Sequence, residues 1–223
     1  MFWTFYRRQE SGVITKTLFS FAPAPVPAWN KTSVLPPPFS FDRNIFTRAG
    51  FHRTGQTAVK FEHIRQKPPR TLLNERSLLI ACSPLRSHVN LSTIIRTAGC
   101  CGVREVIATG NVKLISRIAR DGAENVMLTT RNSLPPVLRK LRDDGYSLVG
   151  LEQTTNSTQL SDYMFEGKTA LVVGAEREGL SDSCLALLDA VVEIPVWGMP
   201  FSYNVATATS MAMYEYCRQF PNG

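Results

Sequence analysis

Three short segments of the chain combine polar side chains with glycines and stand apart from the apolar runs around them. The first is NLSTIIRTA, residues 90–98, in which Asn90 precedes Arg96. An arginine side chain keeps its proton at the pH of cells, and its planar fork can hold a phosphate through two hydrogen bonds. Arg96 is therefore a candidate for gripping an anionic substrate, although the pattern alone also fits an arginine that pairs with an acid on a helix surface.

The second segment is LVVGAEREGLSD, residues 171–182. A strand-like run ends at Gly174, and Glu176 and Gly179 follow before Ser181, which we expect to cap a helix. Glycines at a strand exit let the backbone come close to a ligand. The spacing is not GxGxxG, and the chain has no GxxxxGK[ST], so the motifs argue against both a dinucleotide fingerprint and a P-loop.

The third segment is IPVWGMPFSYNVATA, residues 194–208, where Ser202 and Asn204 come just before a run of small residues. Serine and asparagine at a helix start satisfy free backbone N–H groups. The same two side chains could instead bind a ligand in a tight site. We keep both interpretations at this point.

Apolar runs and helical spacing alternate along residues 77–223, and this order predicts an α/β fold with a parallel sheet covered by helices on both faces. Asn90 stands at the predicted N-cap of the first helix. Ligands of such sheets lie beyond the carboxyl ends of the strands, so we expect chemistry in the loops that follow them. The predicted strands are residues 77–82, 104–110, 125–130, 146–152, 169–174 and 190–196. The predicted helices are residues 90–98, 113–122, 134–141, 182–189 and 205–216.

Charge is distributed unevenly along the 223 residues. Residues 1–70 hold 11 Lys and Arg against 3 Asp and Glu, whereas the whole chain has 25 against 18. This composition divides the chain into a Pro-rich arm at 1–42, disordered or similar to a presequence, a basic extension at 43–76 and a domain at 77–223. A basic segment on a near-neutral domain favours a polyanionic partner, above all nucleic acid, over an ordinary solvated tail.

The five cysteines show no CxxC pair and no clustering with histidine. A zinc site and a disulfide framework are therefore both poorly supported, and we expect buried free thiols in a reducing compartment. No apolar run is long enough to span a membrane. We expect a cytoplasmic protein, or a mitochondrial one if the source is eukaryotic and residues 1–20 act as a presequence.

Taken together, the three segments resemble the three motifs of the SpoU/TrmH branch of the SPOUT RNA methyltransferases. The residues that match are NxSxxxRTA at 90–98, lvvGaEreGls at 171–181 and IPvwGmpfSyNVatA at 194–208, and the resemblance covers about residues 72–219. Tyr203 departs from the usual leucine of the third motif, and Leu91-Ser92 is a mild departure in the first.

This resemblance implies a C-terminal trefoil knot, a homodimer, bound S-adenosylmethionine and no metal. The implied reaction is methyl transfer to a ribose 2′-hydroxyl of RNA, with tRNA guanosine preferred and rRNA as the alternative. A module that binds RNA without catalysis is a second class of function, and an oxidoreductase is disfavoured because GxGxxG is missing. The resemblance assigns catalytic roles to Arg96, Asn90, Glu176, Ser202 and Asn204, and contacts to the cofactor to Gly174, Ile194, Tyr203, Asn204 and Thr109.

Overall fold

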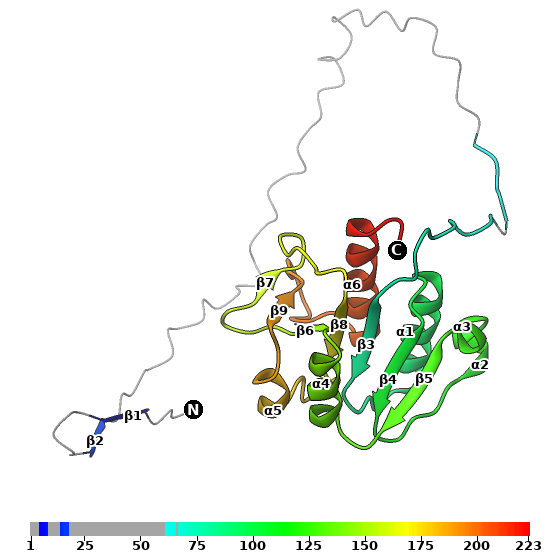
Figure 1. Ribbon diagram of the computed structural model, residues 1–223. Coiled ribbons are helices and arrows are strands. Elements are labelled where there is room, and N and C mark those ends of the chain that lie inside the picture. The colour runs from blue at the N-terminus through cyan, green and yellow to red at the C-terminus, as the bar shows by residue number, and fades with distance from the viewer. Residues whose placement is uncertain (1–4, 9–13, 18–60, 66) are drawn as a thin grey trace, which may run out of the picture. The chain divides into compact units, whose positions relative to one another are not determined.

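The computed structural model describes residues 5–8, 14–17, 61–65 and 67–223 of the chain (Figure 1). The chain forms two compact units, residues 1–63 and residues 64–223. The domain predicted at 77–223 lies within the second unit. The residues just before 77 join this unit because the backbone N–H groups of Leu73 and Asn74 donate to the carbonyl of Asn222, at 2.9 and 3.2 Å.

In the first unit, β1 (Phe5–Arg8) and β2 (Ile14–Thr17) form a two-stranded antiparallel sheet in which Phe5 is opposite Thr17. The sequence did not predict these strands. Most of the predicted Pro-rich arm and of the basic extension falls in residues 18–60, which lie outside the described residues.

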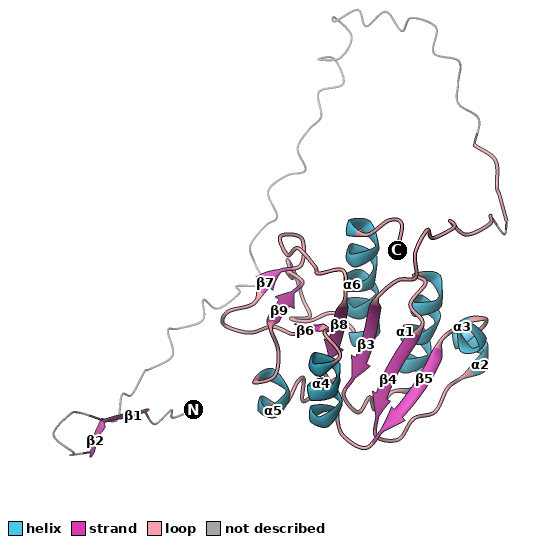
Figure 2. Cartoon of the chain, in the orientation of Figure 1, coloured by secondary structure: helices cyan, strands magenta, loops and turns pink. Residues whose placement is uncertain are grey.

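The second unit is built on a sheet with the strand order β5-β4-β3-β8-β6-β9-β7, and every neighbouring pair is parallel (Figure 2). This confirms the predicted parallel sheet. The sequence did not predict β7, because two exposed polar residues carry no hydrophobic pattern. The strands are β3 (Leu78–Cys82), β4 (Glu105–Thr109), β5 (Met127–Arg131), β6 (Ser147–Leu151), β7 (Thr158–Gln159), β8 (Thr169–Val173) and β9 (Ala190–Glu193).

Helices cover both faces of this sheet. The alternating side chains of β3 show why: Ile80 packs in one apolar cluster with α1 and α6, and Leu79 packs in another with α4 and α5. None of the helices in the described part of the chain is long and apolar enough to cross a bilayer. The helices are α1 (His88–Cys100), α2 (Ser116–Ala119), α3 (Gly122–Asn125), α4 (Leu134–Asp143), α5 (Asp182–Leu185) and α6 (Val205–Gln219).

Three predicted helices have different bounds in the structure. The helix predicted at 182–189 is shorter, since α5 ends at Leu185. Helix α1 begins earlier than expected, because Ser87 is the N-cap and its hydroxyl accepts from the backbone N–H of Asn90 at 3.3 Å. Asn90 is thus in the first turn of α1 and its side chain is free for other contacts. The single helix predicted at 113–122 is two short helices, α2 and α3, because Arg120 between them has a φ of 50°.

All five cysteines are free thiols. Cys82 and Cys184 are buried as expected, and burial raises the pKa of the Cys82 thiol to about 12. Cys100 is exposed, so the expectation of buried thiols is wrong at this position. It is the last residue of α1 and belongs to neither apolar cluster of the core.

Candidate active site

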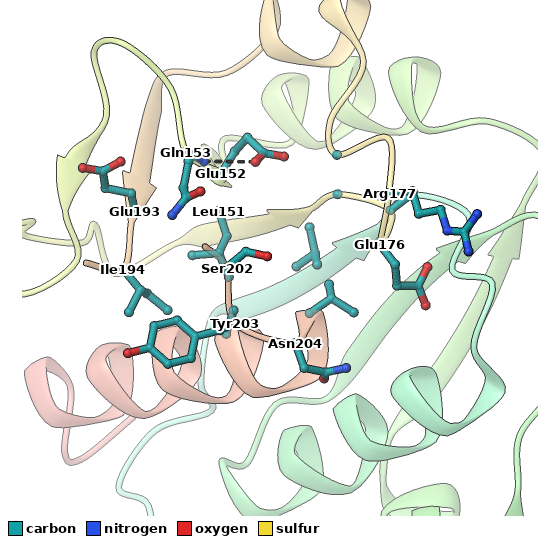
Figure 3. A pocket seen from close by; sticks show the side chains of 16 residues that line it. Leu151, Glu152, Gln153, Glu176, Arg177, Glu193, Ile194, Ser202, Tyr203 and Asn204 are labelled. Carbon is teal, nitrogen blue, oxygen red and sulfur yellow. Dashed lines mark hydrogen bonds between the residues drawn. The ribbon is translucent and has the colours of Figure 1, made fainter. Parts of the chain in front are cut away.

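A pocket of about 460 Å³ opens where β6, β8 and β9 end (Figure 3). Leu151 ends β6, Gly174 follows β8, and Ile194 follows β9, and all three line the pocket. Carboxyl ends of parallel strands are where such folds bind ligands, as the sequence analysis expected. Glu152 and Gln153 also line the pocket, although no sequence motif singled them out. Their place at the end of a predicted strand was the available signal.

A chain of side-chain hydrogen bonds joins the three polar segments at the edge of this pocket. The Nδ2 of Asn204 donates to Oδ1 of Asn90 at 3.1 Å, and the Nδ2 of Asn90 donates to Oε1 of Glu176 at 2.9 Å. Asn204 also caps α6, because its Oδ1 accepts from the backbone N–H groups of Ala206 and Thr207. The capping interpretation of Asn204 is confirmed, and its side-chain amide group also takes part in the network.

Glu176 is the acceptor at the other end of this network. Its carboxylate also accepts from the backbone N–H groups of Arg86 and Ser87, at 2.9 and 3.0 Å. Burial raises the pKa of the Glu176 carboxyl, but the hydrogen bonds from Arg86, Asn90 and Ser87 outweigh burial and hold its pKa below the ordinary value. Glu176 thus holds the loop before α1 through hydrogen bonds to its backbone.

The lowered pKa of Glu176 predicts how stability responds to acid. A carboxyl whose pKa is lower in the folded than in the unfolded protein stabilises the fold above its ordinary pKa, and this contribution is lost as the pH falls through the folded pKa. We expect Glu176→Gln to unfold more easily than the wild type near pH 7, with a difference that shrinks below about pH 4.5. Urea unfolding across this pH range measures it. A difference independent of pH would contradict the assigned hydrogen bonds.

Arg96 lies apart from this network. Its side chain is exposed on α1, it does not line the pocket, and within the described residues it has no hydrogen bond or ion pair. Six residues along an α-helix turn the side-chain direction by about 600°, so Arg96 points about 120° away from Asn90 around the helix. Within the described residues of the isolated chain, Arg96 therefore pairs with none of Asn90, Asn204 and Glu176.

The remaining predicted residues divide into two groups. Gly174, Ile194, Ser202 and Tyr203 all line the pocket, together with Asn204 and Glu176. Thr109 does not: it is buried at the end of β4, and its hydroxyl donates to the carbonyl of Cys82 at 3.0 Å. Strand β3 separates β4 from β8 in the sheet, which explains why Thr109 does not reach the pocket.

The SpoU rRNA Methylase family matches residues 77–214, which is more than half of the chain and includes the network and the pocket. The chain belongs to this family. Membership agrees with the resemblance seen in the sequence and implies the C-terminal trefoil knot.

Curated relatives in the SpoU family have different RNA substrates in their names. The chain is 32% identical over 152 residues to the 23S rRNA (guanosine-2′-O-)-methyltransferase RlmB of Acinetobacter baylyi, covering 66% of this chain and 61% of the relative. It is 31% identical over 158 residues to the tRNA (guanosine(18)-2′-O)-methyltransferase of Thermus thermophilus, covering 70% and 77%. The chain therefore spans less than two thirds of the length of the first of these relatives.

A solved structure shares the fold. The SpoU methyltransferase AviRb of Streptomyces viridochromogenes, in complex with AdoMet, superposes with a TM-score of 0.60 at 27% identity. The match covers 68% of this chain and 63% of AviRb. The α/β fold with a parallel sheet is thus the fold of SpoU methyltransferases.

Proposed function

We propose that this chain is an S-adenosylmethionine-dependent methyltransferase that acts on ribose 2′-hydroxyls of RNA. The observation that carries the proposal is the network that joins Asn90, Glu176 and Asn204 beside the pocket. Each of these residues comes from a different one of the three segments, and the fold brings them together at the strand ends. An RNA-binding module without catalysis would not require such an assembly next to a pocket for a small molecule.

The pocket suits S-adenosylmethionine in size and in chemistry. Its volume of about 460 Å³ is in the range of sites for small ligands. A Cβ at Gly174 would lie 2.6 Å from the backbone carbon of Gly179, so glycine there allows close approach of the backbone. Glu152 and Glu193 bring carboxylates that complement a cationic ligand, and Ile194 adds an apolar side chain for an adenine ring. Gly174, Ile194, Tyr203 and Asn204 would hold the cofactor.

S-adenosylmethionine supplies, when bound, a methyl group that is already activated on a sulfonium. The chain's own residues must then place a 2′-hydroxyl in line with that methyl group and allow its proton to leave. Arg96 keeps its own proton, so we assign it the grip on the phosphate next to the target ribose. The proton passes to a phosphate oxygen of the substrate or to water. Ser202 and Asn204, at the pocket, are placed to contact the ribose.

For the substrate we favour tRNA guanosine by resemblance. We keep rRNA as the alternative, because the relatives' names divide between the two. We expect the protein in the cytoplasm, or in mitochondria if the source is eukaryotic and residues 1–20 are a presequence. No metal is assigned a role. This choice of RNA rests on similarity.

A homodimer through α1 and α6 is part of the proposal. Tyr214 and Met211 on α6 are 71% and 37% exposed, and Val89 on α1 is 49% exposed. Arg96 follows Val89 by seven residues, close to two helical turns, and so shares its face of α1. A dimer through this face would bury these apolar side chains and place Arg96 at the interface, where a second copy can complete the site. Light scattering should give twice the 24.8 kDa of one chain.

The test of the function is transfer of a tritiated methyl group from S-adenosylmethionine to unmodified tRNA and to large-subunit rRNA transcripts. We expect 2′-O-methylguanosine in nuclease digests of one RNA class, identified by mass spectrometry. A methyl group on a base would contradict the proposed reaction. Binding of either RNA with no methyl transfer would instead support the non-catalytic RNA-binding module.

The basic composition of residues 1–70 predicts a separate effect on RNA binding. Deleting residues 1–70, with their 11 Lys and Arg, should weaken binding and reduce the slope of log affinity against log salt by roughly 0.7–0.9 for each lost phosphate contact. Binding of S-adenosylmethionine should not change, because the pocket lies wholly in residues 151–208. If filter-binding titrations gave an unchanged salt slope, residues 1–70 would have no role in RNA recognition.

A further inference from the structure

The loop between β9 and α6 exposes a group of large apolar side chains. Trp197 is 87% exposed, Met199 is 74% exposed and Phe201 is 77% exposed. The loop is also open at its tip, since a Cβ added at Gly198 would meet no atom within 4 Å. Folding does not explain such exposure, because none of these side chains belongs to either apolar cluster of the core.

This loop forms one rim of the pocket. Ser202 and Tyr203, which directly follow Phe201, line the pocket, and Figure 3 shows both side chains beside Leu151 and Ile194. The Nε2 of Gln153 donates to the carbonyl of Phe201 at 3.3 Å, which ties the loop to the end of β6. A ligand that projects out of the pocket would therefore meet this rim first.

The chemistry of the rim suits the flat face of a nucleobase. The segment from Ile194 to Asn204 contains no charged residue, so it would not repel the phosphates of an RNA strand. Arg177, which is exposed and also lines the pocket, can attract them. Tryptophan and phenylalanine stack on bases of any sequence, because every base offers an aromatic face.

We propose that Trp197 and Phe201 form a stacking platform for a nucleobase of the RNA substrate, the target base or its neighbour. This inference rests on the proposed function and adds to it a recognition element. A ribose whose 2′-hydroxyl reaches the pocket carries its base within reach of the rim. Aromatic side chains lose little conformational entropy on binding, so this platform would fix the base and thereby the ribose.

The test uses binding rather than methylation, so that its failure can be told from failure of the proposed function. In the full chain with Trp3→Phe and Trp29→Phe, Trp197 is the remaining tryptophan. We expect its fluorescence to be quenched by a short unstructured RNA but not by a sugar–phosphate chain of the same length without bases. Trp197→Ala and Phe201→Ala should each weaken binding of that RNA about 5-fold to 150-fold, with affinity for S-adenosylmethionine unchanged.

The matched controls are one conservative variant and one distant variant. Trp197→Phe should retain most of the affinity, because it keeps an aromatic face. Met127→Ala, at an exposed apolar side chain on the opposite edge strand β5, should leave RNA binding unchanged. The platform would be overturned if the sugar–phosphate polymer without bases quenched Trp197 as strongly as the RNA. It would also be overturned if Trp197→Ala left the affinity for RNA unchanged. Loss of dimer mass in Trp197→Ala would assign the rim to a second copy of the chain and would also overturn it.

Discussion

Arg96→Ala should lower the rate of methyl transfer to RNA at least about 100-fold, while leaving the free energy of unfolding and the affinity for S-adenosylmethionine unchanged. The side chain is exposed, lies outside the pocket and has no partner within the described residues, so the isolated fold does not depend on it. Its proposed task is to hold a substrate phosphate, and loss of a charged positioning group acts on the reaction and not on folding. Tritium transfer under single-turnover conditions measures the rate.

Two controls separate position from charge in the Arg96 experiment. Arg139→Ala removes an exposed arginine from α4, on the other face of the sheet, and should leave the rate unchanged. Arg96→Lys keeps the charge but loses the planar fork, and we expect an intermediate rate. A wild-type rate in Arg96→Ala would exclude the arginine from the mechanism. If Arg96→Ala lowered the free energy of unfolding by as much as it raised the activation free energy of methyl transfer, Arg96 would have a structural role.

Gly174→Ala should have the second large effect, on both folding and binding of the cofactor. The added Cβ would lie 2.6 Å from the carbon of Gly179 and 2.8 Å from the nitrogen of Leu180, and both are backbone atoms that cannot rotate away. We expect the loop to open, at a cost of about 1–3 kcal/mol in the free energy of unfolding. The affinity for S-adenosylmethionine should fall about 10-fold or more, because this loop lines the pocket.

The chain offers a matched control at the other rim of the pocket. Gly198→Ala adds the same methyl group where no atom lies within 4 Å, so it should change neither stability nor affinity for the cofactor. Calorimetric titration with S-adenosylmethionine and urea unfolding of both variants provide the comparison. Equal behaviour of the two alanine variants would mean that the close approach at Gly174 does not shape the pocket.

Much of the fold was predictable because its signals are local. A buried parallel strand is a continuous apolar run, and the run at 169–174 gave β8 within a residue. Some helix boundaries were not predictable. Ser87 rather than Asn90 caps α1, and the pattern does not distinguish two polar residues so close together. The break between α2 and α3 is a second case, since Gly122 packs tightly on the backbone of Ile95 in α1.

The sequence predicted several residues that lie together at the site, but not which of them form hydrogen bonds with one another. The three motifs identified Asn90, Glu176 and Asn204, and the structure joins them by hydrogen bonds. The six-residue spacing already turns Arg96 about 120° away from Asn90 on a helix, but only the structure shows that Arg96 pairs with neither Glu176 nor Asn204. The sequence offered no reason to exclude Thr109, which ends a strand as the pocket residues do but on β4.

The sequence by itself determined the family, the alternation of strands and helices, and the residue types that the chemistry needs. These are properties of short segments, and short segments carry their own pattern of apolar and polar side chains. Only the tertiary structure decided which strand ends meet in one pocket and which polar atoms pair there. That choice depends on the order of strands in the sheet. Strand β8 lies between β3 and β6, although β3 is distant from both in the chain, and no local pattern specifies such an order.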